Sequence, residues 1–434
     1  MNPPPHRQAL RVGLLGFGVV GSGTHAVLTG NRATIAARAG CGIELAMVAT
    51  RTPARARAAV GPEVEVLHDA MRLATHPAID VVVEAIGGTT VARDCVLAAI
   101  AHGKHVVTAN KALLALHGDE IFAAARERGV SVGFEGAVAV SIPIVKALRE
   151  GLTANRIEWL AGIVNGTSNY VLTQMRDHGR DYDGALREAQ ARGYAEADPA
   201  LDVDGGDAAH KLSLLAAMAF GGGPRLGDVH VEGIRGVQPA DFAHAARLGH
   251  TIKLLAVARR SGAGMQLRVH PALAPADGLL ARVDGRMNGI VVQGDASGVT
   301  MYYGAGAGSR ETASAVVADL VDLARALRQG SRPCVPALGF HDDAAAPQPV
   351  EPLASLCLAQ YFRVPLATPG AAPGVLQALQ RHGIRPIRQV AADGELALLT
   401  QPAPEAHAAA AAHAVAALAC GIITRLRVEP LEQD

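Results

Sequence analysis

Residues suited to chemistry concentrate in the stretch from Gly193 to Lys211 of this 434-residue sequence. A loop there, broken by glycine and proline, holds five carboxylates: Glu196, Asp198, Asp202, Asp204 and Asp207. Asp207 and Lys211 are four residues apart at the start of a helical pattern, so both side chains lie on one face of that helix. An ammonium group held beside carboxylates can bind a polar substrate and exchange a proton with it.

An acidic loop of this kind is often only solvated surface. Three observations favour a functional site. The loop ends where a helix begins, and the helix continues with an apolar stripe that would hold Lys211 near a core: Leu212, Leu214, Leu215 and Met218. Lysine is also scarce, with 5 lysines against 35 arginines. A lysine retained in such a chain suggests a role that arginine cannot fill, such as releasing a proton near neutral pH.

The first 140 residues predict the elements that would position a cofactor. A short apolar strand, Leu10 to Leu15, runs directly into Gly16-Phe-Gly-Val-Val-Gly21 and then into a helical run that ends near Ala39. In this fingerprint the first glycine permits a tight turn, the second lets the backbone approach a pyrophosphate, and the third lets the helix pack on the strand. The phosphates would lie at the helix N-terminus.

Four further strands are expected in this region, at 43–49, 80–85, 105–108 and 130–134, with alanine-rich helices between them. Such alternation predicts an α/β fold with a parallel, doubly wound sheet of the Rossmann type. Ligands bind these sheets at the carboxyl ends of the strands. Gly87 and Lys111 each follow one of the expected strands, so both are candidates for that crevice.

The end of the second strand bears on the choice of cofactor. An NAD site normally places an acid there for the ribose hydroxyl, but the sequence reads Ala49-Thr50-Arg51. Arginine suits a 2′-phosphate, which favours NADP. NAD stays open, as does the simpler reading that Arg51 is only an exposed surface residue.

Composition argues against several classes of protein. A formal net charge of +0 disfavours nucleic acid and anionic membranes as partners. The five cysteines are dispersed without metal-ligand spacing, which fits a reduced, cytoplasmic protein. The N-terminus does not resemble a signal peptide, and no apolar run approaches the roughly 20 residues of a membrane span.

The length predicts two or three domains. A nucleotide-binding domain is expected at 1–143 and 304–328, where a second glycine turn and a helix would return to it. An α+β mixed-sheet domain at 144–303 would carry the substrate site and a dimer interface. Residues 329–352, rich in proline and alanine, are expected to be a linker. Residues 353–434 follow a β-α-β-β-α-β order, as in a ferredoxin-like module.

Taken together, the motifs resemble the homoserine dehydrogenase family. They run in order from about Val12 to Ala326: the glycine turn, Glu84-Ala-Ile-Gly-Gly, Thr108-Ala-Asn-Lys-Ala, Asn165-Gly-Thr-Ser-Asn-Tyr, and the Gly193 to Lys211 stretch, which is the most specific. The resemblance implies reversible hydride transfer between NAD(P)H and L-aspartate 4-semialdehyde, giving L-homoserine for threonine and methionine biosynthesis. It further implies a homodimer or homotetramer.

The resemblance also implies roles for individual residues. Lys211 would be the acid/base lysine and Lys111 could share the transfer of the proton; which of them delivers it stays open. Residues that would bind the substrate are Gly193, Glu196, Asp202 and Asp207. Residues that would bind the cofactor are Phe17, Gly18, Val19, Val20, Gly21, Arg51, Gly87 and Lys111.

Two further properties of the family carry departures in this sequence. The family holds a structural monovalent cation, usually sodium, and its ligands map to Glu135, Val138, Val140 and Ile142, although small glycines are common where Val140 and Ser141 stand here. The C-terminal element order resembles the ACT regulatory module, which in this family is linked to threonine feedback. Its first strand-to-helix turn lacks the usual acid, so a dimerisation module that binds nothing is the alternative.

Two other functions remain open at this point. One is a non-catalytic, cofactor-binding regulatory paralogue, against which the intact Lys111, Glu196, Asp207 and Lys211 argue. The other is a Rossmann oxidoreductase that acts on a different semialdehyde. That chemistry would need an acylating cysteine, and none of the five cysteines lies in a catalytic motif.

Overall fold

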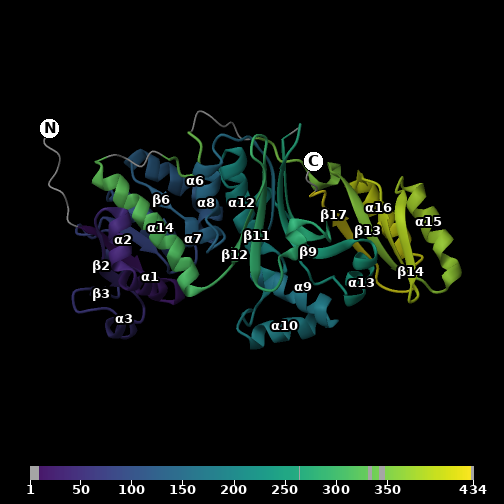
Figure 1. Cartoon of the computed structure of the whole chain (residues 1–434), viewed down its shortest axis with the longest axis horizontal. Coiled ribbons are helices and arrows are strands. Elements are labelled where there is room, and N and C mark those ends of the chain that lie inside the picture. Colours follow the sequence, from purple (N-terminus) through teal and green to yellow (C-terminus); the bar gives the residue numbers. More distant parts are fainter. Residues whose placement is uncertain (1–8, 263, 331–334, 342–347, 432–434) are drawn as a thin grey trace. The chain divides into compact units, whose positions relative to one another are not determined.

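The computed structural model describes residues 9–262, 264–330, 335–341 and 348–431 (Figure 1). The chain divides into two compact units. Unit 1 comprises Met1–Arg156, Ser213–Gly227 and Gly304–Pro347, and unit 2 comprises Ile157–Leu212, Asp228–Tyr303 and Gln348–Asp434. Within the described residues, no helix is long and apolar enough to cross a membrane.

Unit 1 is built on a six-stranded parallel sheet with the order β3-β2-β1-β4-β5-β6. Its strands are β1 (Ala9–Leu15), β2 (Gly42–Ala49), β3 (Glu65–Leu67), β4 (Val81–Glu84), β5 (His105–Thr108) and β6 (Val132–Gly133). The strand order reverses between β1 and β4, which is the switch point of a doubly wound sheet. The expected fold class of this part is confirmed, and the short extra strand β3 was not anticipated.

Helices of unit 1 follow the strands in the expected alternation. They are α1 (Val19–Gly30), α2 (Arg32–Ala39), α3 (Pro53–Ala59), α4 (Ala70–Ala74), α5 (Val91–Ala101), α6 (Lys111–Arg128), α7 (Glu135–Val138), α8 (Ile144–Lys146), the π-helical turn η1 (Ala147–Gly151) and α14 (Ser309–Arg328). The single helix expected up to Ala39 is two helices, because the chain leaves helical geometry at Asn31.

Helix α14 packs against α1 (Figure 1), and both helices share a hydrophobic core with strands of the sheet. A Cβ atom added at Gly23 of α1 would lie 2.4 Å from Ser309 Oγ, so glycine permits the close approach of the two helices. The segment Gly304–Pro347, which contains α14, thus belongs to the same compact unit as the glycine turn.

Unit 2 contains an 11-stranded mixed sheet, whose main path is β12-β11-β7-β9-β10-β17-β13-β15-β14. The strands are β7 (Ile157–Ile163), β8 (His230–Val231), β9 (His250–Arg260), β10 (Met265–Pro275), β11 (Met287–Gly294), β12 (Gly298–Ala305), β13 (Cys357–Pro365), β14 (Pro386–Ala392), β15 (Glu395–Thr400), β16 (Ala403–Pro404) and β17 (Thr424–Val428). β10 pairs in parallel with β17, which joins the C-terminal strands to the central ones.

Longer helices in unit 2 are α9 (Gly166–His178), α10 (Tyr182–Ala191), α13 (Pro239–Arg247), α15 (Ala372–Arg381) and α16 (Glu405–Ala416). The short α11 (Ala200–Val203) precedes α12 (Gly206–Phe220), whose first residues belong to this unit. The C-terminal order β13-α15-β14-β15-α16-β17 matches the expected β-α-β-β-α-β pattern apart from the short β16. Parts of the expected linker, 331–334 and 342–347, lie outside the described residues.

Candidate functional site

The glycine turn after β1 has the geometry that a bound dinucleotide requires. Gly16 has φ +94°, and a Cβ atom there would lie 2.5 Å from the carbonyl oxygen of Ala85. A Cβ atom at Gly21 would lie 2.2 Å from the carbonyl oxygen of Gly16. Both positions therefore exclude a side chain because of the turn and the packing of α1.

Gly18 differs from the other two glycines, because a Cβ atom there would meet nothing within 4 Å. It is the N-cap of α1, which has no side-chain cap and no acid in its first turn. The exposed N–H groups of such a helix start suit a phosphate. The site therefore fits a pyrophosphate, with Gly18 facing open space, Val19 exposed and Phe17 buried in the core.

A second feature of the crevice was only partly anticipated. The buried carboxylate of Glu84, the last residue of β4, accepts hydrogen bonds from the backbone N–H groups of Ile86 and Gly87, both at 3.0 Å. Its other oxygen accepts the hydroxyl of Thr108 at 2.6 Å. Glu84 thus fixes the loop at Gly87, whose φ is +74°. The Glu84 motif supported the family resemblance, but its role in fixing this loop could be recognised only from the fold.

Lys111 is the first residue of α6 and is partly buried. The helix is capped by Asn110, whose Oδ1 accepts the N–H of Leu113 at 3.1 Å and whose Nδ2 donates to the carbonyl of Gly88 at 2.7 Å. Lys111 is therefore held at the carboxyl end of β5, as expected. Arg51 is exposed just after β2. This position is compatible both with a partner of the 2′-phosphate of NADP and with a simple surface residue.

In unit 2, Lys211 lies at the centre of a buried polar cluster. The residue is only 5% exposed, and its ammonium donates to the carbonyl of Val164 at 2.6 Å and to Asp207 Oδ2 at 2.8 Å. Asn165 Nδ2 donates to the same Asp207 oxygen at 2.8 Å and to Asp202 Oδ1 at 2.7 Å. Burial raises the pKa of Asp202, and the hydrogen bond from Asn165 opposes that shift.

The five carboxylates of the Gly193 to Lys211 stretch have different surroundings. Asp202 and Asp207 belong to the Lys211 cluster. Asp204 is paired with Arg235, with Nη2 and Oδ2 3.0 Å apart, and Asp198 accepts the N–H of Ala200 at the start of α11. Glu196 is exposed and takes no part in the hydrogen bonds of that cluster within the described chain. Gly193, with φ +71°, is exposed in the same loop.

The polar side chains at the start of α9, which belong to the Asn165-Gly-Thr-Ser-Asn-Tyr motif, hold the acidic loop. Thr167 Oγ1 donates to the carbonyl of Tyr194 at 2.7 Å, Ser168 Oγ donates to the carbonyl of Asp202 at 2.8 Å, and Asn165 bridges the two carboxylates. Such groups are satisfied internally because a buried polar group without a partner is costly.

The loop expected to hold a cation begins at Glu135, which is buried. Both of its carboxylate oxygens accept backbone N–H groups, from Val145 at 3.0 Å and from Lys146 at 2.9 Å. Val140 has φ +54°, so a β-branched residue adopts the left-handed conformation where glycine was expected. Within the described residues, no group of three or more His, Cys, Asp or Glu side chains could hold a metal ion.

Comparisons with known proteins agree with this geometry. Residues 16–135 match the family model "Homoserine dehydrogenase, NAD binding domain", and residues 143–321 match "Homoserine dehydrogenase". The chain belongs to the homoserine dehydrogenase family. Neither matched range reaches the C-terminal module.

Relatives extend the similarity across the chain. A homoserine dehydrogenase of Pseudomonas aeruginosa is 52% identical over 86% of both chains, and one of Neisseria gonorrhoeae is 43% identical over 97% of this chain and 99% of its own. The crystal structure of a homoserine dehydrogenase from Thiobacillus denitrificans has a TM-score of 0.93 at 48% identity and covers 98% of this chain and 99% of its own. As a homoserine dehydrogenase, the protein is an NAD(P)-binding oxidoreductase of aspartate-family amino-acid biosynthesis.

Proposed function

We propose that Lys211 is the group that gives a proton to the aldehyde oxygen of L-aspartate 4-semialdehyde and takes it back from L-homoserine. The observation that carries this role is the buried ammonium of Lys211, which is oriented by Val164 O and Asp207 Oδ2. A bound nicotinamide supplies the hydride. As negative charge develops on the aldehyde oxygen, a positioned ammonium both stabilises that charge and delivers a proton.

We assign supporting roles to the residues around it. Asp207 orients Lys211, and Asp202, linked to Asp207 through Asn165, completes the polar wall. The exposed carboxylate of Glu196 is suited to the substrate ammonium, and Gly193 lets its loop adopt a positive φ. Lys111 at the start of α6 is proposed to share the proton transfer.

On the cofactor side, the backbone from Phe17 to Gly21 would bind the pyrophosphate, and Gly87 would allow the backbone to approach the nicotinamide half. Exposure of Arg51 after β2, with no acid at the end of that strand, supports a preference for NADP over NAD. Because Glu135 already accepts two N–H groups, a sodium ion would depend chiefly on the carbonyls of Val138, Val140 and Ile142.

Three wider proposals rest on the resemblance alone. The protein would act as a homodimer or homotetramer in the cytoplasm. The C-terminal module would be an ACT-type regulatory domain with threonine as an allosteric ligand. Titration of threonine against activity tests that last proposal, and no inhibition at millimolar threonine would remove it.

The proposal for Lys211 is tested with Lys211→Met in the homoserine oxidation assay. We expect kcat to fall by about 10²- to 10⁴-fold, which is the range for loss of a general acid or base, while the Kd for NADP stays unchanged. Lys104→Met is the matched control, because Lys104 is also buried and donates to a carbonyl, that of Ile79 at 2.9 Å. Equal losses of kcat in both variants, or turnover retained in Lys211→Met, would refute the assignment.

A further inference from the structure

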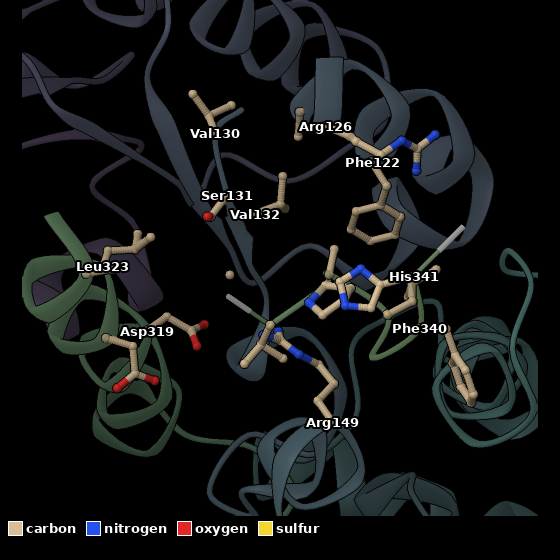
Figure 2. A pocket seen from close by; sticks show the side chains of 18 of the residues that line it. Phe122, Arg126, Val130, Ser131, Val132, Arg149, Asp319, Leu323, Phe340 and His341 are labelled. Carbon is tan, nitrogen blue, oxygen red and sulfur yellow. The ribbon is translucent and has the colours of Figure 1, made fainter. Parts of the chain in front are cut away.

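A large cavity in unit 1 takes no part in the site described above. Its volume is about 900 Å³, which lies within the range of small-molecule pockets. It is bounded by α6, β6, η1, α14 and the segment 335–341 (Figure 2). None of the residues assigned to the cofactor or the substrate lines it.

Arg149, on the π-helical turn η1, is the most distinctive charged group of the cavity. Its Nε is buried and has no hydrogen-bond partner among the described residues. The guanidinium lies over the ring of Phe134, 6.0 Å from its centroid. Figure 2 shows the Arg149 side chain extending toward the space that Phe122 and His341 also face. A guanidinium presents a planar fork of donors that matches a carboxylate.

Of the three other lysines and arginines on the cavity wall, Lys146 and Arg325 are already engaged by groups of the protein. Lys146 forms an ion pair with Asp322 and also donates to the carbonyl of Ala318. Arg325 Nη1 lies 3.2 Å from the same Asp322, and its Nε donates to the carbonyl of Arg38 at 2.9 Å. Arg149 therefore differs from both, since no ion pair or hydrogen bond of the described chain occupies its head.

Other lining residues restrict what Arg149 could bind. Four carboxyl groups also line the cavity, those of Asp119, Glu150, Asp319 and Asp322, and in their charged form they would repel a multiply charged anion. Apolar surface is supplied by Phe122, Phe340, Val132, Leu323 and Leu338. A singly charged ligand with an apolar body matches both properties.

We propose that this cavity binds a small organic carboxylate with an apolar body, and that Arg149 is its anchor. The apolar body would occupy the space between Phe122 and Phe340, away from the glycine turn. This site is an addition to the proposed catalytic roles and does not depend on them.

Occupancy of the cavity would be felt by the loop that follows β6. Asp319, on the cavity wall, accepts the backbone N–H of Glu135 at 2.9 Å. Glu135 in turn caps the N–H groups of Val145 and Lys146, just before the turn that carries Arg149. A ligand anchored on Arg149 is therefore expected to restrain residues 135–151, and π-helical turns such as η1 are frequent at functional sites.

Isothermal titration calorimetry of the whole protein with 3-phenylpropanoate tests the site, using 3-phenylpropanamide and inorganic phosphate as comparison probes. We expect the carboxylate to bind at millimolar concentration or below. The amide and inorganic phosphate should bind at least about tenfold more weakly, because the amide lacks the charge-assisted pair to arginine and phosphate lacks the apolar contacts. Hydrogen exchange of residues 135–151 should slow when the carboxylate is bound.

Three variants locate the binding. Arg149→Leu should weaken it at least tenfold, Arg149→Lys should weaken it less because the charge but not the fork remains, and Phe340→Ala should weaken it through the apolar wall. Arg128→Leu, at an exposed arginine of α6 outside the cavity, should bind normally. No binding of 3-phenylpropanoate, equal affinity for the amide or phosphate, or full affinity in both Arg149 variants would overturn the inference. Because binding is measured without turnover, this result is independent of the test on Lys211.

Discussion

Replacing Asp319 by asparagine should change how the stability of the protein depends on pH. Asp319 is buried in unit 1, and burial together with the nearby charge of Glu135 raises its pKa from 3.8 to about 7. Its Oδ2 accepts the N–H of Glu135 at 2.9 Å, an acceptor role that the amide oxygen of asparagine can keep. The variant therefore removes the ionisation and retains the hydrogen bond.

The sign of this pH dependence follows from the upward shift of the Asp319 pKa. The folded protein binds this proton more tightly than the unfolded chain, so its contribution to stability is complete below the unfolded pKa and is lost as pH rises through the folded pKa of about 7. At about 1.4 kcal/mol per pH unit, a folded pKa near 7 implies a loss of about 2 to 3 kcal/mol between pH 5 and pH 8. Asp319→Asn lacks this loss. The difference in unfolding free energy between the variant and the parent should therefore shift in favour of the variant by about 2 to 3 kcal/mol from pH 5 to pH 8.

Urea unfolding followed by circular dichroism at pH 5 and pH 8 measures the effect as a difference of differences. Asp277→Asn, at an exposed carboxyl, is the control and should show the same free-energy difference from the parent at both pH values. If the gap between Asp319→Asn and the parent is also equal at pH 5 and pH 8, then Asp319 does not take up a proton in this range and the reasoning fails.

Two further predictions concern a buried ion pair of unit 2 and the glycine turn of unit 1. Arg268→Met should lower the free energy of unfolding by about 3 to 5 kcal/mol, because the fully buried carboxylate of Glu429 accepts hydrogen bonds from Arg268 Nε and Nη2, both at 2.7 Å, and would lose its main cation. Chemical denaturation measures this loss, and a value below about 1 kcal/mol would contradict the prediction. In the glycine turn, Gly18→Ala should keep the parent's melting temperature and raise the Kd for NADP. Gly21→Ala should lower the melting temperature, because its Cβ would lie 2.2 Å from Gly16 O. Equal effects of the two substitutions on melting temperature and Kd would refute the roles assigned to them.

Local requirements explain why the nucleotide-binding part could be predicted closely from sequence. Gly16 is required by the positive φ of its own turn, and Gly21 is required by its close approach to the carbonyl oxygen of Gly16, so both requirements arise within the motif. The further contact of Gly16 with the carbonyl oxygen of Ala85 depends on the fold. The alternation of apolar strands with helices likewise reports a local periodicity. The family resemblance added the identity of the substrate, which no periodicity contains.

Roles that depend on distant partners could not be predicted in this way. Asp204 lies in the same acidic loop as Asp207, yet it is paired with Arg235, which is 31 residues away. Arg149 has no sequence motif, and its significance depends on a cavity formed by α6, η1 and α14. Likewise, the parallel pairing of β10 with β17 brings together segments that are more than 140 residues apart. Spacing alone cannot separate a structural carboxylate from a functional one, because the donor that faces it decides its role.

Asn165 shows how that principle operates around Lys211. The ammonium of Lys211 faces two carboxylates that are largely buried, those of Asp202 and Asp207. The neutral amide of Asn165 gives one N–H to Asp202 and the other to Asp207, which satisfies both carboxylates without competing electrostatically with Lys211. An aspartate at this position would place a third carboxylate against a single ammonium, and a lysine would repel Lys211. The amide therefore satisfies both carboxylates without adding a charge to the cluster, which leaves the charge of Lys211 available for the proton transfer proposed above.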